Sequence, residues 1–155
     1  MAGVLGAAAK NSGFMTRRGT VIALFACAGA SLAGCGGPIT PDELARSIET
    51  LESTAAEGSL LAKNVADDHS KATFVRVHSR DLADEVQHEA EKLTDAEADR
   101  ADLAAAKSDA IDLADRIGTA LGQMQTAPGS ESDARTAEQA LSRLSEGAKK
   151  LAEGL

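Results

Sequence analysis

Apolar and small residues recur from Thr40 onward in alternating steps of four and three positions. This spacing places them on one face of an α-helix, whose period is 3.6 residues. Four such stripes follow one another along the chain. They comprise Leu44, Ile48, Leu51, Ala55, Gly58, Ala62 and Val65, then Val75, Ser79, Leu82, Val86, Ala90 and Leu93, then Ala96, Leu103, Ala106, Ala110, Leu113, Ile117, Ala120 and Met124, and finally Ala134, Ala137, Leu141, Leu144, Ala148, Leu151 and Leu155.

Helix start and stop signals separate the stripes. Residues 40–43, Thr-Pro-Asp-Glu, predict a capping box with proline at the first helical position. The polar cluster at residues 67–70 interrupts the pattern, and Thr-Asp-Ala-Glu at 94–97 predicts a second capping box, with a tight turn or kink and a third helix from about Ala96. Residues 127–130, Ala-Pro-Gly-Ser, end that helix, and Ser130 can cap a fourth.

The stripes and breaks predict an all-α fold, an antiparallel up-down helical bundle of three to four helices over residues 40–155. Many stripe positions are Ala or Gly, so the helices can approach closely while each contact buries little area. A three-helix core with a frayed fourth helix is one alternative. A single coiled-coil rod is another, against which the Pro128-Gly129 break argues.

Charge divides the chain into two parts. Residues 1–34 contain no Asp or Glu, whereas residues 35–155 carry all 24 acidic residues and 13 of the 16 basic ones, a net charge of −11. Such asymmetry is typical of a targeting segment ahead of a soluble body. Arg17-Arg18 precede the apolar run Val21–Leu32, which is shorter than the roughly 20 residues that a membrane-spanning helix needs.

Leu32-Ala33-Gly34-Cys35 resembles the lipobox of bacterial lipoproteins. The resemblance implies that residues 1–34 are a signal peptide cleaved after Gly34, and that Cys35 carries a diacylglyceryl group and, on its amine, an acyl chain such as palmitate. Residues 35–39 would then be the lipidated cysteine and a short tether. The protein would face the extracytoplasmic side of the cell membrane or outer membrane.

Several points about this N-terminal segment stay open. An ordinary signal peptide or membrane anchor with an incidental cysteine is the alternative to a lipoprotein signal. Met15 is a more typical start than Met1, and Arg17-Arg18 also fits a twin-arginine route, although the general secretory route is preferred. With Cys27 discarded and Cys35 acylated, the mature chain has no disulfide.

A second, shorter resemblance covers residues 57–62 and the pattern Phe74-x-Arg76-x-His78-x-x-x-Leu82. It is similar to short uncharacterised bacterial lipoproteins expected to form helical bundles. It implies no function.

No catalytic, cofactor-binding or metal-binding residue is predicted, and the chain is not expected to be an enzyme. Glu85 and His88 have the spacing of a Glu-x-x-His ligand pair, but a di-metal bundle needs a second pair, and neither His69 nor His78 follows a Glu by three positions. Because Val86 belongs to the core stripe, we expect Glu85 and His88 to face solvent. The net charge of −11 and the lone aromatic Phe74 in the mature chain argue against nucleic-acid binding.

One stretch differs from the acidic remainder. Lys71 begins it, and Phe74, Arg76, His78 and Arg80 are candidate contacts for a protein partner. The alternative is that Phe74 packs in the core while the arginines form ion pairs with neighbouring helices.

These observations leave two hypotheses. The first is a lipid-anchored, non-enzymatic structural or protein-interaction module bound to the membrane and to an unidentified envelope protein. The second is a small-ligand or metal-binding lipoprotein associated with transport. An open apolar cleft lined by Phe74 would favour the second, and a closed Leu/Ala core would favour the first.

Overall fold

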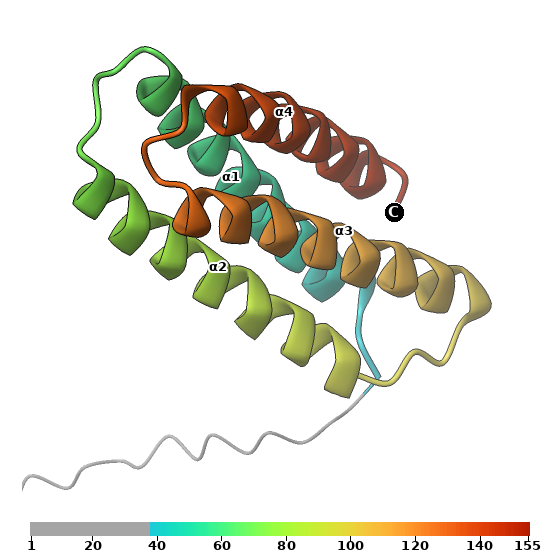
Figure 1. Ribbon diagram of the computed structural model, residues 1–155. Helices are drawn as coiled ribbons and strands as arrows, with labels where there is room; N and C mark the ends of the chain where they lie inside the picture. The colour runs from blue at the N-terminus through green and yellow to red at the C-terminus, as the bar shows by residue number, and fades with distance from the viewer. Residues whose placement is uncertain (1–37) are drawn as a thin grey trace, which may run out of the picture. The chain divides into compact units, whose positions relative to one another are not determined.

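The computed structural model describes residues 38–155, which form a four-helix bundle (Figure 1). The helices are α1 (Pro41–Ala66), α2 (Ala72–Asp95), α3 (Ala101–Thr126) and α4 (Glu131–Glu153). Consecutive helices run antiparallel, which confirms the predicted up-down bundle with its fourth helix fully formed. The predictions for residues 1–37, including the signal peptide and Cys35, lie outside the described residues.

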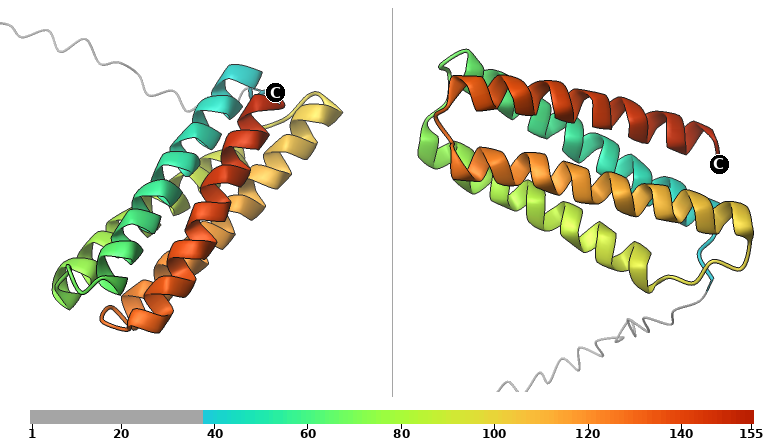
Figure 2. Two further views of the ribbon diagram at one scale, coloured as in Figure 1. Left: turned by 90° about the horizontal axis from the view of Figure 1, so that it is seen from above. Right: turned by 45° about the vertical axis from the view of Figure 1, so that its right-hand side comes forward.

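The four helices pair unequally. The most extensive contacts join α1 to α4 and α2 to α3, whereas no contact joins α2 to α4 in the described bundle. The α1–α2 and α3–α4 loops lie at one end, which we call the distal pole (Figure 2). Pro38, the α2–α3 loop and the C-terminus lie at the other end, the N-terminal pole.

The predicted capping box starts α1. The Thr40 hydroxyl accepts a hydrogen bond from the Glu43 amide at 3.3 Å, and the Glu43 carboxylate accepts one from the Thr40 amide at 2.9 Å. Pro41 occupies the first turn, where its missing amide hydrogen costs nothing. Ser130 caps α4 as predicted, because its hydroxyl accepts a hydrogen bond from the Asp133 amide at 3.3 Å.

The boundary between α2 and α3 differs from the prediction. Thr94 lies inside α2 and donates its hydroxyl to the Ala90 carbonyl at 2.7 Å, so no capping box forms there. A five-residue loop follows, and α3 begins at Ala101 rather than near Ala96. Contacts distant in sequence stabilise this loop, since the Ile39 amide donates to the Glu97 carbonyl at 2.7 Å and Lys107 donates to the Ala96 carbonyl at 2.8 Å.

Ile39 belongs to the core. It is not part of the predicted tether of residues 35–39, because only 7% of its surface is exposed. Burial of Ile39 and its hydrogen bond to Glu97 attach the chain to the body two residues before α1 begins.

The predicted stripes form the core. Every residue of the first stripe is buried, and so are most residues of the other three. The exceptions lie near helix ends or in the small-residue positions, where Ala90, Ala96, Ala106 and Leu151 are partly buried and Leu155 is exposed. Within residues 38–155, no buried side-chain nitrogen or oxygen lacks a hydrogen-bond partner.

A close approach to the backbone of α1 occurs at Gly58. A methyl group placed there would lie 2.9 Å from Cδ2 of Leu121 on α3 and 3.1 Å from Cδ1 of Leu141 on α4. Only glycine leaves room for both leucines, so this position joins three helices. The adjacent Ser59 hydroxyl donates to the Glu138 carbonyl of α4 at 3.3 Å.

Two leucines of α1 provide a matched pair for testing the core, one buried and one exposed. Leu51 is fully buried and Leu60 is 59% exposed. We expect Leu51→Asp to lower the free energy of unfolding by about 3 kcal/mol or more, because it places an unpaired charge in the core. Leu60→Asp, the matched control, should change it by less than about 0.5 kcal/mol. Thermal melts followed by circular dichroism measure both, and equal melting of the two variants would contradict this core.

The capping box also predicts a pH dependence. Hydrogen bonds from the Thr40 amide and hydroxyl hold the pKa of Glu43 below its ordinary value. A carboxyl group whose pKa is lowered by folding stabilises the protein above its unfolded pKa, near 4.3, and this contribution is lost as the pH falls through the folded pKa. NMR titration should show the Glu43 pKa rising toward its ordinary value in Thr40→Ala. An unchanged pKa in that variant would contradict the capping box.

Candidate functional site

The most distinctive surface of the bundle is the first half of α2, at the distal pole. Val75 and Ser79 are buried, and the Ser79 carbonyl accepts a hydrogen bond from the Gln125 amide group of α3 at 3.2 Å. These contacts fix the rotation of α2 about its axis and turn the neighbouring positions outward. We call the residues that they expose the distal patch; it comprises Lys71, Phe74, Arg76, Val77, His78 and Arg80.

Phe74 lies on the surface. Its side chain is 57% exposed, so the alternative that it packs in the core is wrong. Its ring stacks on His78, one helical turn away, with the centroids 5.3 Å apart and the planes 20° from parallel. Phe74 lies in the first turn of α2, one position before Val75, the first buried residue of this helix.

His78 connects the patch to α1. Its Nε2 lies 2.8 Å from Oε1 of Glu57, and its side chain is 32% exposed. Glu57 was not predicted as a site residue. The pairing of Glu57 with His78 depends on how α1 and α2 are aligned along their length. The loop between the two helices sets that alignment, so neither helix sequence alone predicts the pair.

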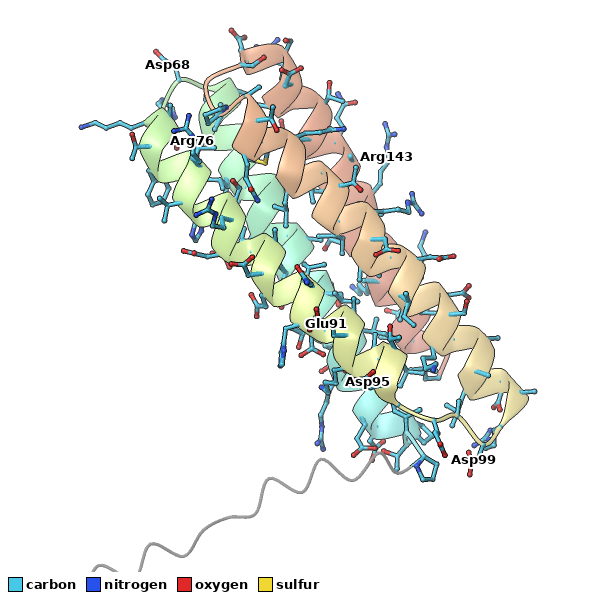
Figure 3. The ribbon with its side chains drawn as sticks, turned by 60° about the horizontal axis from the view of Figure 1, so that its bottom comes forward. Asp68, Arg76, Glu91, Asp95, Asp99 and Arg143 are labelled. Carbon is cyan, nitrogen blue, oxygen red and sulfur yellow. The ribbon has the colours of Figure 1, made fainter. Side chains whose placement is uncertain are left out.

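The arginines of the patch have no charged partner in the described part of the chain. No carboxylate of residues 38–155 lies within 4.0 Å of a charged nitrogen of Lys71, Arg76 or Arg80. The alternative that Arg76 and Arg80 form ion pairs with neighbouring helices is therefore wrong for these residues. Figure 3 shows Arg76 near the distal pole with Asp68, while Glu91, Asp95 and Asp99 lie toward the opposite pole.

Leu60 adds apolar surface near the patch. Glu57 pairs with His78 across antiparallel helices, so Leu60 on α1 and Phe74 on α2 both lie one turn closer to the distal pole. The two side chains are 59% and 57% exposed. Sequence reasoning missed Leu60, because an apolar residue beside a core stripe more often packs at its edge.

The Glu-x-x-His pair faces solvent. Glu85 and His88 are both exposed, while Val86 between them is 2% exposed and packs in the core, as predicted. His69 is exposed in the α1–α2 loop. Within residues 38–155, no three His, Cys, Asp or Glu side chains lie close enough together to hold a metal ion.

Grooves run along α3. One lies against α2 and is lined by small residues such as Ala83, Ala114 and Gly118, and others lie against α4. Thr119 and Gln123 contribute polar groups to the grooves against α4, and Phe74 lines none of these grooves. None of the four described helices is long and apolar enough to span a bilayer.

Cys35, the predicted lipidation site, lies outside the described residues. The chain matches no family model, no curated protein and no solved structure in the comparisons with known proteins. The distal patch and the lipobox resemblance therefore carry the functional interpretation.

Proposed function

We propose that the protein is a lipid-anchored component of the cell envelope that acts as a non-enzymatic protein-interaction module. Cys35 supplies the anchor, and the distal patch contacts a protein partner. The observation that carries this proposal is the exposed Phe74, stacked on His78, in a stretch of α2 whose arginines have no charged partner in the described bundle. Aromatic and arginine side chains dominate the binding energy of many protein interfaces.

The support for the anchor is the order of features in the N-terminal segment. Basic residues, a short apolar run, small residues and Cys35 follow one another as in a lipoprotein signal. Ile39 is already fixed in the core, so only four residue steps separate it from Cys35. A chain of that length reaches at most about 14 Å. The N-terminal pole is thereby held close to the bilayer.

The position of the patch supports the interaction. The 26 residues of α1 span about 39 Å and separate the N-terminal pole from the distal pole. A patch at the far end of the bundle is accessible to proteins of the envelope. The acidic surface between the two poles disfavours binding of the bundle along an anionic membrane.

Lipidation of Cys35 is the first test. Mass spectrometry of the membrane-extracted protein should show an N-terminal peptide that begins at Cys35 and carries added acyl mass. We expect Cys35→Ala to leave an uncleaved precursor or to release the protein from the membrane, because the lipid is its only predicted anchor. Cys27→Ala is the matched control and should be processed normally. An unmodified Cys35 in the mature protein would refute the anchor.

The second test concerns the partner. We expect the intact lipoprotein, solubilised from its own membrane, to recover a specific envelope protein in pull-down experiments. Arg76→Glu with Arg80→Glu should reduce that recovery at least tenfold, because it reverses two charges at the contact. Arg116→Glu with Arg143→Glu, on the exposed surface of α3 and α4, controls for the change in net charge. Equal recovery by both double variants, with unchanged melting, would show that the patch does not bind the partner.

A further inference from the structure

Charge along α2 is arranged in two blocks. Residues 71–80 contain Lys71, Arg76 and Arg80 and no acidic residue. Residues 81–95 contain six acidic residues and a single base, Lys92. The first turn of α2 has no acid, whereas the first turns of the other three described helices all have at least one.

This order is unfavourable for α2 as a helix. The positive end of a helix dipole, at the N-terminus, favours acidic residues, and the negative end favours basic ones. The two blocks of charge therefore do not stabilise α2 as an isolated helix. Any favourable effect has to come from groups around the helix.

The surroundings within the bundle offer little compensation. Among residues 38–155, α2 makes two ion pairs, His78 with Glu57 and Lys92 with Glu89, and the second of these is internal to the helix. Arg80 and Asp84, on opposite sides of the boundary between the blocks, are exposed and take part in neither pair. Most of the charge on α2 is therefore directed at solvent.

One side of α2 is also free of helices. The helix packs against α1 and α3 and makes no contact with α4 in the described bundle. The exposed residues on the side away from the core are spaced by three and four positions, as on a helix face. We call this side the outer face of α2; it comprises Thr73, Val77, Arg80, Asp84, Gln87 and Glu91.

We propose that the outer face of α2 binds the same face of a second copy of this chain, with the two α2 helices antiparallel. An antiparallel arrangement places Arg80, the basic residue of this face, against the acidic residues of the same face in the other copy. A parallel arrangement would place like charges together and is disfavoured. Two-fold symmetry makes every favourable contact occur twice.

The spacing of the outer face fits this symmetry. With the two-fold axis beside Leu82, Arg80 of each copy faces Asp84 of the other, and Val77 faces Gln87. Thr73 faces Glu91. Every outer-face position then meets another outer-face position, and no pair joins two like charges.

The predicted dimer is weak in solution. The 24 residues of α2 span about 36 Å, and the face of one helix is about 10 Å wide, so the pair buries less than a standard interface of about 1,600 Å². Salt should weaken it further, since the contacts are exposed ion pairs. In the antiparallel pair the N-terminal poles of the two copies lie at opposite ends, so anchorage of both copies upright in one membrane does not favour the dimer.

The test uses a charge exchange that only a symmetric dimer explains. The sample is the purified segment 36–155, which contains the complete core formed by the described residues. We expect equilibrium sedimentation at low salt to show a monomer–dimer equilibrium that shifts to monomer at about 0.5 M salt.

Arg80→Asp and Asp84→Arg should each weaken association at least tenfold, because like charges then meet twice. A mixture of the two single variants should restore it. In the mixed dimer both positions are acidic in one copy and basic in the other, so each of the two contacts again joins opposite charges.

The control is Arg143→Asp on α4, which changes the net charge as Arg80→Asp does but lies away from α2. It should associate like the parent. The self-association proposal fails if the segment is monomeric at low salt and millimolar concentration, if either single variant dimerises like the parent, or if the mixture does not recover. None of these failures bears on the proposed envelope partner, because no other protein is present and that proposal is tested by pull-down. Val77 and Arg80 belong to both the outer face and the distal patch, so the dimer and a partner bound at Arg80 would exclude each other.

Discussion

Leu121 and Leu141 pack against the backbone of α1 at Gly58, and the arrangement of the whole bundle depends on this contact. Residues 38–155 contain no cysteine, and their core consists largely of Ala and Leu, so its stability has to come from close packing. Small residues on α1 and α4 allow these helices to approach, and the contact fixes their register. The register of α1 in turn determines which side chains of α2 pair with it, including His78 with Glu57.

Periodicity predicted the helices well because burial is set by one face of each helix. All seven residues of the first stripe are buried, and the Thr40 and Ser130 caps form as expected. The failure at residues 94–97 has a physical cause. A capping box competes with continuation of the helix, and at Thr94 the bond from its hydroxyl to the Ala90 carbonyl prevails. The loop that follows is held by Ile39 and Lys107, whose contacts no local pattern reveals.

The site was only partly accessible to sequence reasoning. Composition alone identified the basic stretch with Phe74, because it stands out from an acidic chain. Whether Phe74 is buried or exposed could not be decided, since it lies one position from the buried Val75 and a large apolar side chain there can also pack at the edge of the core. Glu57 and Leu60 could be found only after α1 and α2 were placed side by side. The anchor at Cys35 still rests on sequence.

The fixed position of Ile39 has a mechanical consequence for a protein held by its N-terminus. Tension applied through an anchor at Cys35 reaches the body first at Ile39, whose amide is bonded to the Glu97 carbonyl in the α2–α3 loop. The pull is thereby divided between α1 and the α2–α3 hairpin, and the first turn of α1 does not bear it alone. In a protein anchored as proposed, tension at the N-terminal pole would thus be carried by two parts of the bundle that lie far apart in the sequence.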